Sequence, residues 1–305
     1  MLAIVAPGQG AQVPGMLQAW LELPGAQEQL AALSTASGLN LVAHGTTSDA
    51  DTIRDTAVAQ PLIVAAGLLS WTALNSPVAD VVAGHSVGEI TAAVVAGVLT
   101  PADAMGFVQL RGAGMAQAAG NVATGMSAVL GGEASVVVAK ALEHGLTPAN
   151  MNGAGQIVVA GTLEQLEAFA NDAPEGGRVR PLPVAGAFHT EHMAPAVAAL
   201  ETYAVSMTTS DPVSVLLSNA DGNSIDNGND ALRRLVAQVS NPVRWDLCMD
   251  MMVSMGVTGL LELSPGGTLV GLAKRAMPGV ATLAMKSPED LDAARALIAE
   301  HVGKE

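Results

Sequence analysis

The sequence predicts an α/β fold with a mainly parallel sheet and a second, smaller subdomain. Strand-like and helix-like segments alternate along most of the 305 residues, and this order favours a parallel sheet. Half of the residues are hydrophobic but only 2% are aromatic, so small and aliphatic side chains must fill a tightly layered core. From about residue 124, short strand-like and helix-like segments alternate over about sixty residues. The length therefore indicates one large domain or two unequal ones.

The first part of the chain contains two apolar runs that read as buried strands. Residues 2–12 are an apolar run that ends in a glycine-rich loop, and residues 81–85 form a second such run. Residues 57–74 are apolar on nearly all sides and too long for a strand, so they predict a buried helix. Helices are also expected over 87–99 and over 100–117, where Thr100 is a suitable N-cap before a proline.

The middle of the chain predicts a small ferredoxin-like subdomain. Strand-like segments at 125–132, 152–162 and 178–186 alternate with two helix-like ones, in a β-α-β-α-β order. We therefore place this subdomain at residues 124–188 and the parent core at residues 1–123 and 189–305.

The parent core resumes at AFHTEHMAPAVAAL, residues 187–200, which reads as the end of a strand followed by a helix. The later elements expected are a strand, two helices, a further strand and a short terminal α/β unit, the first four at residues 213–219, 231–240, 245–255 and 259–266.

Charge and composition limit the partners and the location of the protein. The formal net charge of −15 argues against nucleic acid, because a negative field repels phosphates. No run approaches the roughly 18 to 20 apolar residues that span a bilayer, and the N-terminus lacks the basic start of a signal peptide. The single cysteine, Cys248, suits a reducing compartment. We expect a cytoplasmic protein with no membrane or metal association.

The stretch GHSVG at residues 84–88 is the first sign of chemistry. In G-x-S-x-G between a strand and a helix, the glycines permit a sharp turn that exposes the serine at the strand's carboxyl end. This turn is typical of an α/β-hydrolase-like core, with Ser86 as nucleophile and the N–H of Val87 as an oxyanion donor. The alternative is that Ser86 only caps the following helix.

A serine nucleophile needs a base, and the chain has six histidines. His189 is the best candidate because GAFHT follows an apolar strand-like segment and precedes a helix. His192 is second, and His85 is expected to pack beneath the turn.

Arg111 lies in an apolar stripe. Ala104, Val108, Arg111 and Met115 share one helix face, so the guanidinium is expected to be buried and to require an anion. That anion is either an internal acid such as Glu89 or a substrate carboxylate. The guanidinium could bind a substrate carboxylate through two parallel hydrogen bonds.

Together these residues resemble the malonyl-CoA:acyl carrier protein transacylases and the acyltransferase domains of fatty acid and polyketide synthases. The resemblance covers nearly the whole chain and lies in an ordered set of motifs: PGQGAQ (7–12), QPLIVAAG (60–67), GHSVGE (84–89), QLRGAGM around Arg111, NGAGQIVVAG (152–161), GAFHT (186–190), NPVRW (241–245) and SPGGTLVGLAKR (264–275).

The resemblance implies a role for each matching position. Ser86 would take the malonyl group as an ester, and His189 would act as base and then acid, oriented by the main-chain carbonyl of Gln238. The N–H of Gln9 would join that of Val87 in the oxyanion hole. Arg111 would hold the malonyl carboxylate. Asn150, Asn152 and Phe188 match further substrate-binding positions.

The implied reaction moves malonyl from malonyl-CoA to the phosphopantetheine thiol of acyl carrier protein, with no cofactor. Carrier protein would bind transiently, with Arg178, Arg180, Lys274 and Arg275 as candidate docking residues, and we expect a monomer. Three rivals stay open: a serine hydrolase or thioesterase acting on acyl-CoA, a dinucleotide-binding enzyme suggested weakly by GQGAQV, and a catalytically idle binding module. The pathway, fatty acid or polyketide, stays open as well.

Overall fold

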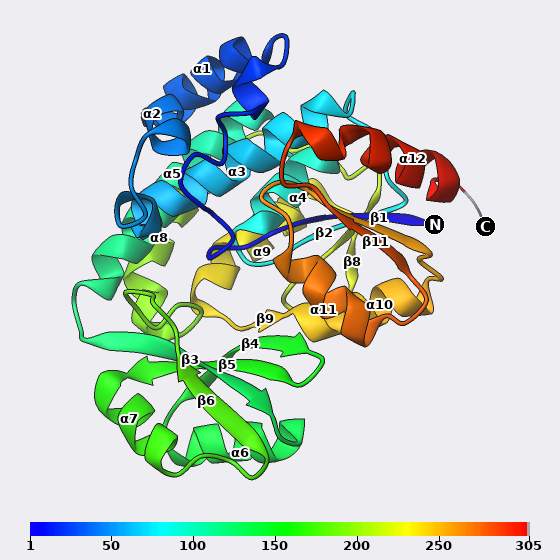
Figure 1. Ribbon diagram of the computed structural model, residues 1–305. Coiled ribbons are helices and arrows are strands. Elements are labelled where there is room, and N and C mark those ends of the chain that lie inside the picture. Colours follow the sequence, from blue (N-terminus) through cyan, green and yellow to red (C-terminus); the bar gives the residue numbers. More distant parts are fainter. Residues whose placement is uncertain (304–305) are drawn as a thin grey trace.

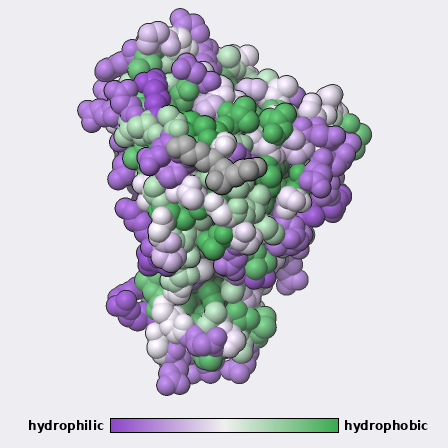
Figure 2. All heavy atoms as spheres, turned by 90° about the vertical axis from the view of Figure 1, so that its right-hand side faces the viewer, coloured by the Kyte–Doolittle hydropathy of each residue, from purple (hydrophilic) through white to green (hydrophobic). Residues whose placement is uncertain are grey.

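The computed structural model describes residues 1–303, and over this range the strands form a six-stranded and a five-stranded sheet. Figure 1 shows a larger lobe around the first sheet and a smaller lobe around the second. Figure 2 shows one side of the molecule, which is wide above and narrower below, with hydrophilic and hydrophobic residues interspersed on that face. The predicted α/β fold, with its α/β-hydrolase-like core and small ferredoxin-like part, is confirmed.

The larger sheet has the order β11-β10-β1-β2-β7-β8 and is parallel except for its last pair. Its strands are β1 (Leu2–Ala6), β2 (Val81–Gly84), β7 (Val215–Leu217), β8 (Ser224–Ile225), β10 (Gly259–Glu262) and β11 (Ala281–Ala284). Because successive side chains of a strand point to opposite faces, β1 contributes to two separate cores. Leu2 and Ile4 face one core, whereas Ala3 and Val5 face the other.

Helices cover both faces of this sheet, as the buried clusters and Figure 1 show. One face packs against α10 (Trp245–Ser254) and α11 (Thr268–Ala276). The other lies under a larger group of helices: α1 (Ala26–Ser37), α2 (Leu41–Thr46), α3 (Thr56–Ala73), α4 (Gly88–Val95), α5 (Pro101–Ala119), α8 (Ala194–Ala204), α9 (Gly228–Ala237) and α12 (Leu291–His301). Short 3-10 helices lie at Trp20–Glu22, Thr52–Arg54, Glu191–Met193, Gln238–Ser240 and Pro288–Asp290.

Helix α3 is long and apolar enough to cross a membrane by length and composition, although the sequence was expected to contain no such segment. In the fold, 72% of this stretch is buried, so α3 is a core helix, as its all-round apolar pattern predicts.

The smaller sheet has the order β6-β3-β5-β4-β9. Its strands are β3 (Thr124–Gly131), β4 (Thr147–Gly153), β5 (Gln156–Thr162), β6 (Gly177–Pro181) and β9 (Val243–Arg244). Helices α6 (Ala134–Glu143) and α7 (Leu163–Asn171) cover one face, packing on Val129, Ile157 and Val159. Met126 and Val158 point to the opposite face, toward the larger lobe. This face of the small sheet therefore packs against the larger lobe and also lines part of a cavity there.

Two segments differ from the sequence expectation. The segment predicted as one strand at 152–162 is half of a hairpin, because β4 and β5 pair antiparallel around Gly153 and Gly155, both with positive φ. His189 does not end a strand: β6 stops at Pro181, and His189 lies in an irregular loop with φ of 62°. Pro181, Pro183 and Gly186 prevent the strand from continuing that far.

Candidate active site

Ser86 lies in the tight turn between β2 and α4. Its φ is 54°, a left-handed conformation that is uncommon for a residue with a side chain. Both flanking glycines are required by space: a Cβ on Gly84 would lie 2.0 Å from the carbonyl carbon of Gly88, and one on Gly88 would lie 2.2 Å from the Ala6 oxygen. The turn therefore presents the hydroxyl at the carboxyl edge of the parallel sheet, as the motif predicts.

His189 is within hydrogen-bonding distance of this hydroxyl. The Oγ of Ser86 lies 2.8 Å from Nε2 of His189, and Nδ1 lies 2.9 Å from the main-chain oxygen of Gln238. A carbonyl only accepts, so Nδ1 carries the proton and Nε2 is left to accept one from the serine. Burial, together with the charge of Arg111, lowers the pKa of His189 to about 3, which keeps the imidazole neutral. The geometry suits a base poised to deprotonate Ser86.

Two main-chain N–H groups are available beside the serine. Val87 begins the turn into α4, and Gln9 lines the same cavity from the loop after β1. Neither N–H donates to an acceptor within the chain as far as residue 303. A Cβ on Gly8 would lie 2.9 Å from the His85 oxygen, so this loop packs directly on the elbow. These free donors suit a developing oxyanion.

Arg111 reaches the nucleophile from α5 and is only 1% exposed. Its Nη1 donates to Gln60 Oε1 at 2.7 Å, and its Nη2 donates to Gln238 Oε1 at 2.8 Å and to Ser86 Oγ at 3.3 Å. Burial lowers the pKa of Arg111 to about 10, so the guanidinium is still positive at neutral pH. Its hydrogen bonds in the described chain all go to neutral groups.

Glu89, the internal acid considered as a partner of Arg111, does not bond to the guanidinium. Its Oε1 accepts from the N–H of Asn219 at 2.6 Å, and its Oε2 contacts Nε2 of Gln238. Burial raises the pKa of Glu89 to about 8, against the lowering effect of these bonds. Gln238 thus stands between the acid and the arginine, and the charge of Arg111 is left facing Ser86.

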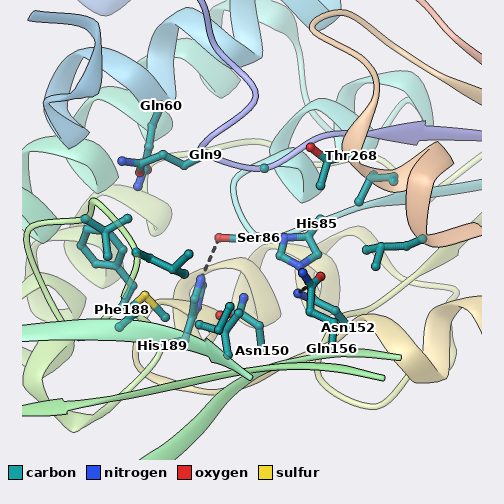
Figure 3. Close-up of a pocket in the computed structure, with 18 of the residues that line it drawn as sticks. Gln9, Gln60, His85, Ser86, Asn150, Asn152, Gln156, Phe188, His189 and Thr268 are labelled. Atoms are coloured by element: carbon teal, nitrogen blue, oxygen red, sulfur yellow. Dashed lines mark hydrogen bonds between the residues drawn. The ribbon is translucent and has the colours of Figure 1, made fainter. Parts of the chain in front are cut away.

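A cavity of about 210 Å³ lies over the serine (Figure 3). The three other predicted binding residues all line it: Asn150 and Asn152 from β4, and Phe188 from the loop after β6. Oδ1 of Asn152 lies 2.8 Å from Nε2 of His85, so His85 does not simply pack beneath the turn but faces the cavity. The remaining walls are largely apolar and include Met115, Met126, Val158, Leu182 and Leu272.

Sequence reasoning missed two polar residues of this site, Gln60 and Asn219, and did not find the contacts of a third, Glu89. Gln60 lies on α3 and caps Arg111, and it is the polar exception in an apolar helix. Asn219 follows β7 at the carboxyl edge of the sheet, next to the strand that ends in the elbow. Glu89 was weighed only as a partner of Arg111. A buried polar residue in an apolar segment was the available signal in each case.

No group of three or more His, Cys, Asp or Glu side chains in residues 1–303 is arranged to hold a metal ion.

Comparison with known proteins places this site in a family. The model of the acyl transferase domain matches residues 4–293. The malonyl CoA-acyl carrier protein transacylase of Mycobacterium tuberculosis is 50% identical over 297 residues, 96% of this chain and 98% of that relative. A crystal structure of MCAT from the same organism superposes with a TM-score of 0.94 over 97% of this chain and 99% of the other.

A second solved structure contains a bound partner. It is a type II PKS acyl-carrier protein in complex with its malonyl-transacylase, 29% identical, with a TM-score of 0.90 over 97% of this chain and 99% of the other. Matches of this extent and identity show that the chain belongs to the acyl transferase family, among the malonyl CoA-acyl carrier protein transacylases.

Proposed function

We infer that this protein transfers a malonyl group from malonyl-CoA to the phosphopantetheine thiol of acyl carrier protein, through an ester on Ser86. The observation that carries this inference is the position of Arg111, whose Nη2 lies 3.3 Å from Ser86 Oγ. A buried cation beside the nucleophile suits an acyl group that carries a free carboxylate in addition to the thioester. A hydrolase or thioesterase for ordinary acyl-CoA would have no use for it.

In the first half-reaction, Nε2 of His189 takes the proton of Ser86 as Oγ attacks the thioester carbonyl. The N–H groups of Gln9 and Val87 stabilise the resulting oxyanion. When the tetrahedral intermediate collapses, the C–S bond breaks, and the imidazolium returns its proton to the coenzyme A thiolate. Malonyl is then held as an ester.

In the second half-reaction, the phosphopantetheine thiol of the carrier protein replaces coenzyme A. His189 accepts the thiol proton, the sulfur attacks the ester carbonyl, and Ser86 leaves as the alkoxide, which His189 reprotonates. Atoms and charges balance with protein groups and two substrates alone, and we propose that no metal or organic cofactor takes part.

Through Arg111, the charge of the substrate also affects the pKa of His189. Its positive charge lowers the pKa of His189 and so disfavours the imidazolium that forms during the reaction. A malonyl carboxylate on Arg111 would offset that charge. The base would therefore be strengthened when a dicarboxylic acyl group is bound, which favours malonyl over acetyl in the transition state.

We propose that carrier protein docks across the cavity mouth. A complex of a carrier protein with its malonyl-transacylase, at 29% identity to this chain, supports this kind of partner. Residues of α11 and Leu182, just beyond β6, line the cavity. The exposed basic candidates lie on these two elements: Arg178 and Arg180 on β6, and Lys274 and Arg275 on α11. Basic residues here would attract an acidic partner to a protein whose net charge is −15.

We propose further that the enzyme works as a monomer in the cytoplasm, away from membranes. Its single cysteine and acidic composition support this setting.

The direct test follows radiolabelled malonyl-CoA with and without holo acyl carrier protein. Transfer of label to the carrier thiol supports the proposal, and apo carrier protein, which lacks the thiol, is the control. Release of free malonate at the same rate whether or not carrier protein is present would instead identify a thioesterase.

A further inference from the structure

A buried asparagine, Asn219, braces the turn that holds Ser86. It is 0% exposed and follows β7, the strand that pairs with β2. Its Oδ1 accepts the N–H of Ser86 at 2.8 Å, and its Nδ2 donates to the Gly84 oxygen at 2.8 Å. The carboxamide of Asn219 therefore bonds to the main chain at two positions, at Gly84 and at the nucleophile Ser86.

The bond to the Ser86 N–H matters because of the conformation of that residue. With φ of 54°, Ser86 has left the strand and not yet entered α4, so its N–H takes no part in regular structure. Left-handed residues with side chains persist only where the surroundings fix them. Only a carboxamide supplies both the acceptor for Ser86 and the donor for Gly84, since an aspartate lacks the N–H and a leucine lacks both.

Asn219 also connects the nucleophile to the loop that orients the base. Its main-chain N–H donates to Glu89 Oε1 at 2.6 Å, and Glu89 Oε2 contacts Nε2 of Gln238. The Nε2 of Gln238 also lies 3.3 Å from Oδ1 of Asn219 and 3.3 Å from the main-chain oxygen of Ser86. Gln238 in turn accepts from His189 through its main-chain oxygen and from Arg111 through its side chain.

We propose that Asn219 is a positioning residue that, together with Glu89, fixes Ser86 and Gln238 relative to each other. Nucleophile, base and carboxylate clamp then keep one geometry although they come from three separate segments. Asn219 does not line the cavity, so it acts through Ser86 and Gln238 and not on the substrate. The proposal rests on the proposed function only in its assignment of Ser86 and His189 as the reacting pair.

The test measures the reactivity of Ser86 with a fluorophosphonate probe, which needs an activated serine but neither malonyl nor coenzyme A. We expect Asn219→Ala to lower the labelling rate by about tenfold to a hundredfold, the scale of a small misplacement of reacting groups. Asn223→Ala is the matched control, because Asn223 is an exposed asparagine in the connection that follows β7. It should label at the wild-type rate.

With malonyl-CoA, the same Asn219 variant should lose acylation rate to a similar degree while KM changes less than about twofold, because the cavity lining is intact. A purely structural defect would instead reduce the active fraction and leave the rate of the folded fraction unchanged.

Asn219→Asp is the second variant, in case the alanine variant does not fold. It keeps the shape and the acceptor for Ser86 but loses the donor to Gly84, and it should label more slowly than wild type. Labelling of either folded variant at the wild-type rate overturns the positioning role. If wild type labels but does not transfer malonyl, the proposed function fails while the positioning role is still measured.

Discussion

The Oγ of Ser86 lies 2.8 Å from Nε2 of His189, although 103 positions separate the two residues in the chain. Both residues have positive φ, 54° for Ser86 and 62° for His189, so neither is held by a regular element. Each depends on a contact from elsewhere: Asn219 binds the N–H of Ser86, and the main-chain oxygen of Gln238 binds the ring of His189. The reacting pair is therefore assembled by tertiary structure, and its geometry depends on two residues that do not line the cavity.

Replacing Arg111 with alanine should separate malonyl from acetyl transfer. The guanidinium reaches Ser86 Oγ, so its loss removes a charged hydrogen-bond partner of the malonyl carboxylate. We expect kcat/KM for malonyl-CoA to fall by roughly tenfold to a hundredfold, or about 1.5 to 3 kcal/mol. Acetyl-CoA should lose little. For Arg111→Lys, which keeps the charge but not the planar fork, kcat/KM for malonyl-CoA should lie between those of wild type and Arg111→Ala. An equal loss for both acyl groups would contradict the clamp.

Gln60→Glu should inhibit malonyl transfer by occupying the clamp. Oε1 of Gln60 is 2.7 Å from Nη1 of Arg111, so a glutamate there would place a permanent carboxylate on the guanidinium. We expect about a tenfold loss of kcat/KM for malonyl-CoA, the scale of one charged hydrogen bond. Gln60→Met removes the amide without adding charge and is the control. Steady-state kinetics should show the larger loss with glutamate; the reverse order would refute competition for Arg111.

Gly88→Ala should destabilise the whole fold. The new Cβ would lie 2.2 Å from the Ala6 oxygen, and neither main chain can yield without moving the elbow or β1. We expect the free energy of unfolding to drop by about 3 kcal/mol or more in urea denaturation. Gly271→Ala is the control, since that helical glycine has open space around it and should gain about 0.5 to 1 kcal/mol. Similar stabilities of the two variants would show that the contact at Gly88 is not tight.

The buried imidazole of His189 should make folding stability depend on pH. Its pKa is about 3 in the folded state against an ordinary 6.5, so between these values the unfolded chain binds a proton that the folded chain does not. Stability from this group is therefore complete above about pH 6.5 and is lost as pH falls. Between about pH 7.5 and pH 5.5 the loss is about 1 kcal/mol.

His189→Asn should remove this contribution, so its stability should fall less over the same range than that of wild type. His192→Asn replaces a half-exposed imidazole outside the cavity and controls for the general effect of removing a histidine. Equal slopes for wild type and His189→Asn in denaturant titrations at the two pH values would contradict a neutral, buried imidazole.

The sequence predicted best where one local pattern determines the structure. The glycines at 84 and 88 are both required by space, and they predicted the tight turn and the position of Ser86 at the carboxyl end of β2. The apolar stripe on α5 placed Arg111 inside the protein, where the structure finds it 1% exposed. The alternation of elements gave the α/β fold for the same reason, since each element follows from its own periodicity.

Prediction was weaker where contacts between distant segments determine the position or role of a residue. His189 was expected at a strand end and lies in a loop, fixed in position by the carbonyl of Gln238. The contacts of Gln60 with Arg111 and of Glu89 with Asn219 and Gln238 join residues 51 to 149 positions apart, which no local pattern reports. Buried polar groups must find partners, but the sequence does not say which.

The measurement that tests the central claim most directly is the intact mass of the protein after brief mixing with malonyl-CoA. We predict that wild type gains the mass of one malonyl group and that Ser86→Ala, with the hydroxyl removed beside an otherwise unchanged His189 and Arg111, gains nothing. A malonyl adduct of equal yield on Ser86→Ala would place the acyl group on another residue and contradict the account.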